Sequence, residues 1–152
     1  MAKTTHRLYT DGGARGNPGP AGFGVVLETS DGELVEEVAR GIGWATNNVA
    51  EYEGLIEGLR TALRNGVKSL AVYMDSTLVI QQMRGAFKVK NPGLKPLHAT
   101  AAELASQFDH VQFQAIPRER NKHADRLSNQ GMDACRGVEP SPAPQAGQQT
   151  LL

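Results

Sequence analysis

Cysteine is almost absent from this chain. The only one among 152 residues is Cys135, which excludes an internal disulfide and leaves no paired Cys and His ligands for a zinc site. The chain also lacks an apolar stretch of signal-peptide length near its start and any run of about 18 apolar residues that could cross a membrane. We therefore expect a soluble protein of a reducing compartment, the cytoplasm.

A net charge is missing as well. The chain carries 16 basic and 16 acidic residues, so its formal charge at pH 7 is zero. Attraction to a polyanion must therefore come from an uneven distribution of charge rather than from the total. Residues 28–37 contain acidic but no basic side chains, whereas residues 84–95 contain basic but no acidic ones. One part of the surface can face phosphates and another cannot.

Length and composition indicate one folded domain. A chain of 152 residues with 39% hydrophobic residues suffices for one core of ordinary size. From Gly137 onward the sequence is rich in Pro, Gln and Ala, and it has too few apolar residues to offset the entropy of ordering. We predict a domain over residues 1–136 and a disordered tail over residues 137–152.

The spacing of apolar residues predicts strands first and then alternating helices and strands. Short turns join the first three strands, which favours antiparallel pairing, and later strand–helix–strand crossovers favour parallel pairing. The expected fold class is α/β, with a mixed five-stranded sheet of three antiparallel and two parallel strands and helices on both faces. The strands are expected at residues 6–10, 23–27, 34–42, 69–74 and 111–116, and the helices at residues 47–65, 76–84, 97–108 and 121–134.

Four carboxylates stand out as candidates for chemistry, although each has an ordinary structural explanation. Asp11 could end a strand in a turn, Glu51 could complete a capping box with Asn48, Asp75 could cap a helix, and Asp125 could be a solvated helix residue. The predicted sheet can nevertheless bring all four to one edge, where mutual repulsion would raise some of their pKa values until cations bind. Together they indicate a site for hard divalent cations suited to phosphodiester cleavage.

The residues around these acids form an ordered set of motifs. The motifs are Tyr9-Thr10-Asp11-Gly12-Gly13 with Gly16-Asn17-Pro18-Gly19, Ala45-Thr46-Asn47-Asn48-Val49-Ala50-Glu51-Tyr52, Tyr73-Met74-Asp75-Ser76 and Asn121-Lys122-His123-Ala124-Asp125. In this order, over about residues 6–134, they resemble type 1 ribonuclease H. The resemblance implies a ribonuclease H-like fold and an endonuclease that hydrolyses the RNA strand of RNA/DNA hybrids, leaving 5′-phosphate and 3′-hydroxyl ends.

The resemblance also assigns a cofactor to the acidic residues. It implies that Asp11, Glu51, Asp75 and Asp125 bind two Mg²⁺ ions, which Mn²⁺ can replace, and that Asp11 bridges both ions. Two such ions about 3.5–4 Å apart can activate an attacking water and stabilise the leaving 3′ oxygen. All four acids are therefore expected to be both metal ligands and catalytic residues.

Substrate contacts are expected from a second group of polar residues. Asn17, Asn47 and Asn48 carry donors and acceptors suited to the minor-groove edges of the hybrid, and Thr46 matches a family position that grips a DNA-strand phosphate. Ser76 is a further expected contact. Turn and cap chemistry is the alternative explanation for the same residue types. The expected partner is an RNA/DNA hybrid, bound by a monomer and recognised through ribose 2′-hydroxyls.

Two features depart from the common pattern of the family. The loop at residues 117–120 is short and lacks the histidine that many members carry, and the basic protrusion is missing between residues 84 and 96. The chain thus resembles the short-loop variants, in which Arg118 would reach the scissile phosphate as a fixed positive charge. His123 lies about 200° around the helix from Asp125, so we expect it on the surface.

Some residues and some functions remain outside this scheme. By default Trp44 is expected in the core and His98 on the surface.

The competing functions are a catalytically inactive hybrid-binding module, another nuclease of the same fold, and a small calcium protein. The intact set of acids disfavours the first, the asparagines disfavour the second, and the absence of EF-hand ligand spacing disfavours the third.

Overall fold

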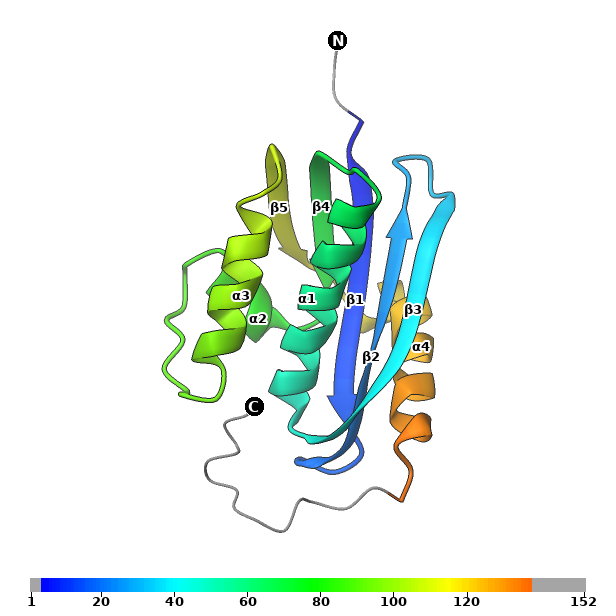
Figure 1. Ribbon diagram of the computed structural model, residues 1–152, viewed down its shortest axis with the longest axis vertical. Helices are drawn as coiled ribbons and strands as arrows, with labels where there is room; N and C mark the ends of the chain where they lie inside the picture. The colour runs from blue at the N-terminus through cyan, green and yellow to red at the C-terminus, as the bar shows by residue number, and fades with distance from the viewer. Residues whose placement is uncertain (1–3, 138–152) are drawn as a thin grey trace.

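A computed structural model describes residues 4–137 and shows one mixed sheet with helices on both faces (Figure 1). The tail expected from residue 137 onward lies outside the described residues, except for Gly137. No helix in the described part is long and apolar enough to cross a membrane. The strands are β1 (His6–Ala14), β2 (Gly19–Glu28), β3 (Leu34–Ala45), β4 (Ser69–Met74) and β5 (His110–Ala115), and the helices are α1 (Asn47–Arg64), α2 (Thr77–Met83), α3 (Lys95–Ala105), the 3₁₀ helix η1 (Arg118–Arg120) and α4 (Lys122–Ala134).

The strand order β3-β2-β1-β4-β5 confirms the predicted fold class. β1 pairs with β2, and β2 with β3, in antiparallel fashion, whereas β1 with β4 and β4 with β5 are parallel. β1 is therefore the centre of the sheet and has an antiparallel partner on one side and a parallel one on the other. This arrangement places the carboxyl end of β4 beside the middle of β1, close to Asp11.

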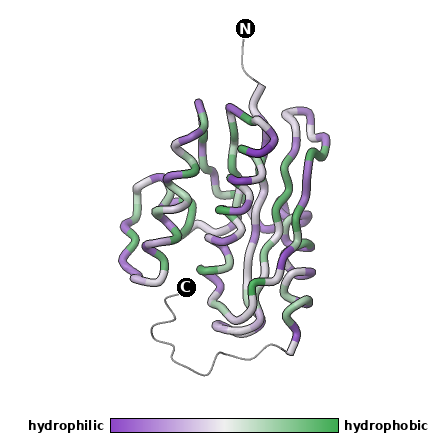
Figure 2. Tube along the Cα trace, viewed as in Figure 1, coloured by the Kyte–Doolittle hydropathy of each residue, from purple (hydrophilic) through white to green (hydrophobic). Residues whose placement is uncertain are grey.

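The helices divide between the two faces of the sheet. α1 and α3 cover one face and α4 crosses the other, behind β1, β2 and β3 (Figure 1). The main core lies under α1 and includes Leu8, Tyr52 and Leu59, each with no exposed surface. A smaller cluster under α4 is formed by Val26, Ala124 and Leu127. In Figure 2, β2 is largely in hydrophobic colours while the turn that follows it is hydrophilic.

β1 is longer than predicted, because it continues through Asp11 to Ala14. Gly12 pairs with Phe23 on β2, so the two glycines after Asp11 extend the strand instead of ending it. Gly12 serves close packing, since a Cβ atom there would lie only 2.4 Å from the carbonyl oxygen of Ala50 on α1. The interpretation of Asp11 as a turn residue is therefore wrong, and Asp11 is 7% exposed inside the sheet.

Two default placements are also wrong. Trp44 is 39% exposed, because it lies near the end of the edge strand β3, where no further strand covers it. His98 is half-buried instead of superficial. Its ring stands edge-on to Tyr52, and its Nε2 lies 3.2 Å from the carbonyl oxygen of Gln82, because this face of α3 packs toward α1 and α2.

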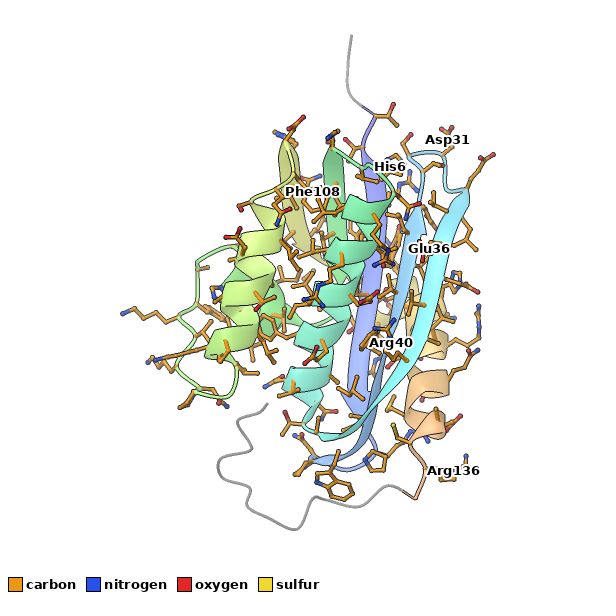
Figure 3. All side chains as sticks on the ribbon, viewed as in Figure 1. His6, Asp31, Glu36, Arg40, Phe108 and Arg136 are labelled. Carbon is orange, nitrogen blue, oxygen red and sulfur yellow. The ribbon has the colours of Figure 1, made fainter. Side chains whose placement is uncertain are left out.

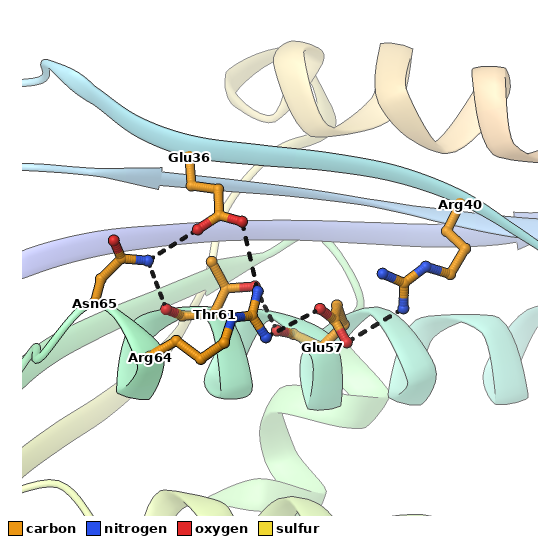
Figure 4. Close-up of polar contacts among 6 residues, drawn as sticks. All are labelled: Glu36, Arg40, Glu57, Thr61, Arg64 and Asn65. Atoms are coloured by element: carbon orange, nitrogen blue, oxygen red, sulfur yellow. Dashed lines mark hydrogen bonds and ion pairs between the residues drawn. The ribbon is translucent and has the colours of Figure 1, made fainter.

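A ladder of charged and polar side chains fastens the edge strand β3 to α1 (Figure 4). The buried Glu57 of α1 lies 3.3 Å from Arg40 on β3 and 3.5 Å from Arg64 at the end of α1. Arg64 in turn lies 3.4 Å from Glu36 on β3, which also accepts a hydrogen bond from Asn65. Two arginines offset the cost of burying one carboxylate, so the ladder fixes the position of β3 on α1.

Candidate functional site

Four structural elements bring the predicted acidic residues toward one another. Asp11 lies in β1, Glu51 in the second turn of α1, Asp75 directly after β4, and Asp125 in the first turn of α4. Tyr9 of β1 is the register partner of Tyr73 of β4. Asp11 and Asp75 each lie two residues beyond that pair, so the parallel register holds them level on neighbouring strands.

Three of the acids form a tight group. One carboxylate oxygen each from Asp11, Glu51 and Asp75 lies within 4.8 Å of the other two. Asp125 is not part of this trio among the described residues, but it lies close enough to raise the pKa of both Asp11 and Asp75. The structure thus places three acids together and the fourth beside them.

The local environment opposes ionisation of these acids. Burial, and next the charge of Asp75, raise the pKa of Asp11 from 3.8 to about 8. Burial is also the largest cause of the raised pKa of Glu51, followed by the charges of Asp11 and Asp75. The pKa of Asp75 is raised by burial and held down in part by Arg118. The expectation of raised pKa values is confirmed, although burial contributes more than repulsion.

The trio fits a divalent cation. Oε1 of Glu51 and Oδ2 of Asp75 are buried and have no hydrogen-bond partner among the described residues. Buried carboxylate oxygens without partners are costly, and a hard cation with oxygen ligands removes that cost. Asp11, Glu51 and Asp75 can therefore hold such an ion.

Helix capping does not explain these acids. Thr46 caps α1 by accepting a hydrogen bond from the backbone N–H of Val49, and Ser76 caps α2 by accepting one from Val79. Glu51 therefore takes no part in a capping box with Asn48, and Asp75 is not the cap of α2. Both alternative interpretations are wrong, which strengthens the metal-binding interpretation.

Arg118 in the short loop and His123 just after it have different surroundings. Nε of Arg118 lies 3.9 Å from Oδ2 of Asp75, and the Arg118 side chain is 83% exposed. The guanidinium thus stands at the rim of the trio, where it can meet a bound anion. His123 turns the other way, and its Nε2 lies 2.7 Å from a carboxylate oxygen of Glu37 on β3. His123 is thus directed toward β3, away from the acids.

The predicted substrate residues gather at the start of α1. Oδ1 of Asn17 accepts a hydrogen bond from the backbone N–H of Asn47 at 2.9 Å, and Oδ1 of Asn47 accepts one from Ala14 at 2.8 Å. These two bonds, which we call the asparagine clamp, tie the β1–β2 loop to α1. Asn48 follows within the first turn of α1, whereas Ser76 lies apart, at the start of α2.

Asn121 was missed as a site residue, because its motif position suggested only the beginning of a helix. Its side chain is buried, and Nδ2 donates a 3.0 Å hydrogen bond to the carbonyl oxygen of Thr10, the residue before Asp11. The residue therefore joins β1 to the start of α4, which carries Asp125. An amide-bearing residue four positions before a predicted ligand was the only signal in the sequence.

Comparisons with known proteins identify a family and relatives that this chain resembles. Residues 9–131 match the family model described as reverse transcriptase-like. The chain is 54% identical over 128 residues to the bifunctional protein Rv2228c of Mycobacterium tuberculosis, a match that covers 84% of this chain and 35% of the relative. It is 42% identical over 125 residues to ribonuclease HI of Halobacterium salinarum, covering 82% of this chain and 63% of the relative. The chain thus spans about a third of the mycobacterial relative's length.

A solved structure adds a likeness in three dimensions. The structure of LC11-RNase H1 in complex with an RNA/DNA hybrid superposes with a TM-score of 0.81 at 44% identity. The match covers 85% of this chain and 97% of that one.

Proposed function

The chain belongs to the type 1 ribonuclease H family, and on this premise we propose that it is an endonuclease that hydrolyses the RNA strand of RNA/DNA hybrids. One observation carries the proposal. Carboxylate oxygens of Asp11, Glu51 and Asp75 lie within 4.8 Å of one another, and Glu51 and Asp75 each have a buried oxygen that has no hydrogen-bond partner among the described residues. This donor set suits divalent cations, which can catalyse phosphodiester hydrolysis by activating a water and stabilising the leaving oxygen.

Asp11, Glu51, Asp75 and Asp125 would hold two Mg²⁺ ions, for which Mn²⁺ can substitute. When bound, the ions supply Lewis-acid activation of a water and stabilisation of the leaving 3′ oxygen, so that the products carry 5′-phosphate and 3′-hydroxyl ends. The protein's own task is to present deprotonated oxygens in a fixed arrangement. β1 and β4 hold Asp11 and Asp75 level, and Asn121 ties the start of α4 to β1.

The hydrogen bonds within the protein at the start of α1 determine which side-chain donors can still bind substrate. The Oδ1 atoms of Asn17 and Asn47 accept backbone N–H groups, so their amide NH₂ groups are left to donate. Minor-groove edges offer acceptors at N3 and O2, and Asn48 can add a further donor. Thr46 and Ser76 accept from backbone N–H groups, which leaves each hydroxyl hydrogen free for a phosphate or a ribose.

The proposed unit is a catalytic domain over residues 1–136 that acts as a monomer. The supporting observation is that the described residues form one sheet, with helices packed on both faces around it. The site is assembled within a single chain, since all four acids come from elements of this sheet and of the helices packed on it.

Cleavage of an end-labelled hybrid tests the proposal. We expect the protein with Mg²⁺ to cut the RNA strand internally, and we expect EDTA to abolish the reaction. The fragment ends are then identified, since a downstream fragment with a 5′-phosphate can be ligated to a 3′-hydroxyl acceptor without prior phosphorylation. Duplex DNA of the same sequence serves as the control. Failure to cut the hybrid at any metal concentration, by protein that melts cooperatively, would contradict the proposal.

Arg118 should support turnover as a fixed positive charge beside the scissile phosphate. We expect Arg118→Ala to lower kcat about tenfold with Mg²⁺, a modest effect because the side chain is 83% exposed and partly screened by water. Arg120→Ala, in the same 3₁₀ helix, is the matched control and should leave kcat unchanged. Equal turnover by the two variants would remove Arg118 from the mechanism.

A further inference from the structure

α4 is tied to β1 and its loop at two points, one on each side of Asp125 in the sequence. Asn121, four residues before Asp125, donates a side-chain hydrogen bond to the carbonyl oxygen of Thr10 on β1. Asn129, four residues after Asp125, accepts a 2.9 Å hydrogen bond from Nη2 of Arg15, the residue that follows β1. Residues four apart lie about one turn from each other on the same side of a helix. Both ties therefore act on the side of α4 that carries Asp125.

The guanidinium of Arg15 spans one turn of α4. Its Nη1 lies 3.0 Å from Oδ1 of Asp133, while its Nη2 donates to Asn129. Two contacts from one planar group fix its orientation, which a single contact cannot do. The Arg15 and Asp133 side chains are 45% and 49% exposed, and ion pairs at such exposure add little to the free energy of unfolding. The two contacts are therefore better suited to holding a position than to stabilising the fold.

Asn129 connects Arg15 to the first turn of α4. Its Oδ1 accepts the hydrogen bond from Arg15, and its Nδ2 donates a 2.9 Å hydrogen bond to the backbone carbonyl oxygen of Asp125. One amide group thus joins the guanidinium to the backbone of the acid through both of its polar atoms. We call Arg15, Asn129 and Asp125 the α4 relay.

Asp125 needs such support more than the other three acids do. Strand pairing holds Asp11 and Asp75 level, and Glu51 lies in a helix whose first turn has a side-chain cap. α4 has no such cap, because Asn121 at the cap position makes no cap hydrogen bond. The first turn of an uncapped helix keeps N–H groups without partners and frays more readily. The position of Asp125 therefore depends on contacts from outside the helix.

The loop that carries Arg15 also carries a predicted substrate residue. Asn17 and Asn47 form the asparagine clamp, which ties this β1–β2 loop to α1. The backbone N–H of Arg15 donates to the carbonyl oxygen of Pro20 at 2.8 Å, which closes the loop. Backbone and asparagine contacts thus hold the loop independently of the Arg15 side chain. Removal of that side chain affects α4 and leaves the clamp in place.

We propose that Arg15 is a positioning residue that holds Asp125 beside the trio through Asn129, so that the loop expected to bind the hybrid also sets the position of the fourth acid. The inference rests on the proposed function and adds a residue to it that touches neither substrate nor metal. A misplacement of about 1 Å can lower a catalysed rate by about 10²-fold. Loss of the α4 relay therefore lowers kcat, whereas affinity for the hybrid is unchanged.

Turnover of a labelled hybrid by the full chain with Mg²⁺ provides the first readout. We expect Arg15→Ala to lower kcat about tenfold with KM unchanged, a partial loss because the tie at Asn121 remains. Asn129→Ala should have the same effect. Arg136→Ala is the matched control, because Arg136 lies 3.5 Å from the same Asp133 oxygen but outside the α4 relay. It should leave both constants unchanged.

A double-mutant cycle tests whether Arg15 acts through Asp125. Single-turnover reactions with enzyme in excess make the slow Asp125→Asn chain measurable, and in that background Arg15→Ala should lower the rate no further. Arg15→Lys keeps the charge, but one ammonium cannot make both contacts, so it should not restore kcat. An equal tenfold loss in both backgrounds would mean that Arg15 acts elsewhere, and full activity of Arg15→Lys would reduce its role to charge. Either result overturns the inference.

Amide hydrogen exchange on the metal-free protein needs no activity and decides the case if the Asp125→Asn rate is too slow to measure. The backbone N–H of Asp125 donates to the carbonyl oxygen of Asn121 at 3.0 Å. In Arg15→Ala this amide and the next turn of α4 should exchange about tenfold faster, while amides of α1 keep their wild-type rates. Unchanged exchange in α4, or equal acceleration in both helices, would overturn the inference.

Failure of this inference differs from failure of the proposed function. A chain that cleaves hybrids equally well with and without the Arg15 side chain refutes only the positioning role. A wild-type chain that does not cleave hybrids refutes the proposed function, and the positioning role with it.

Discussion

Replacing Asp75 by asparagine should lower the rate of hybrid hydrolysis by about 10³-fold or more, which corresponds to a loss of about 4 kcal/mol of transition-state stabilisation. The carboxylate belongs to the 4.8 Å trio with Asp11 and Glu51, and its buried Oδ2 has no hydrogen-bond partner in the described part of the chain. Asparagine keeps the size of the side chain but replaces one anionic oxygen by a group that cannot bind a cation. The loss therefore falls on metal binding.

The fold should survive this change. Ser76, and not Asp75, caps α2, and β4 ends before residue 75, so neither the cap of α2 nor the pairing of β4 depends on the carboxylate. Turnover of a labelled hybrid with Mg²⁺ measures the first effect, and thermal melting in EDTA measures the second. Asp31→Asn is the control, since Asp31 lies in the β2–β3 turn at the opposite end of the sheet from the carboxyl end of β1 (Figure 3). An Asp75→Asn protein with wild-type turnover would end the metal-site interpretation.

Without divalent cations, the protein should become less stable as the pH rises from about 4 to about 8. Burial and the neighbouring acids raise the pKa of Asp11 from 3.8 to about 8 in the folded protein, so the folded state retains a proton that the unfolded chain releases. Through this window the free energy of unfolding falls by up to about 1.4 kcal/mol per pH unit for one such group. The raised pKa values of Glu51 and Asp75 act in the same direction.

Urea unfolding in EDTA at pH 5 and pH 8 measures this effect, which should amount to a few kcal/mol. Asp11→Asn removes one titrating group and a repulsive charge, so it should flatten the pH dependence and exceed the wild-type stability at pH 8. Asp31→Asn should keep the wild-type slope.

Added Mg²⁺ supplies the complementary test at pH 8. Cations bind only the assembled trio, so they should restore stability by about 2.7 kcal/mol at a concentration of 100 times Kd. The Asp11→Asn variant should gain less from the same addition. A free energy of unfolding that is independent of both pH and Mg²⁺ would contradict the raised pKa values.

The sequence predicted the acids of the site better than the distances between them. Motif order identified Asp11, Glu51, Asp75 and Asp125, and the strand order needed to gather them followed from hairpin and crossover rules. Which of them form the trio depends on the register of β1 with β4 and on the depth at which α1 packs. Neither quantity is encoded in a local pattern, so Asp125 was expected inside a group that it only adjoins.

Local rules failed where tertiary packing decides. The two glycines after Asp11 suggested a turn, yet pairing with β2 keeps both extended, and at Gly12 the backbone of α1 occupies the space that a side chain would fill. Trp44 and His98 were misplaced since burial depends on which layer covers a strand end or a helix face. Contacts between residues far apart in the sequence, such as the hydrogen bond from Asn121 to Thr10, are not predicted by any local sequence pattern.

Gly12 sets the distance between α1 and β1, and with it the spacing of the acidic trio. A methyl group on this residue would approach the backbone nitrogen of Glu51 to 2.7 Å, so α1 packs on β1 more closely than any side chain at residue 12 would allow. Glycine at this position thus lets Glu51 on α1 approach Asp11 and Asp75. A larger residue would move Glu51 away from the other two acids while all three charges stayed in the protein.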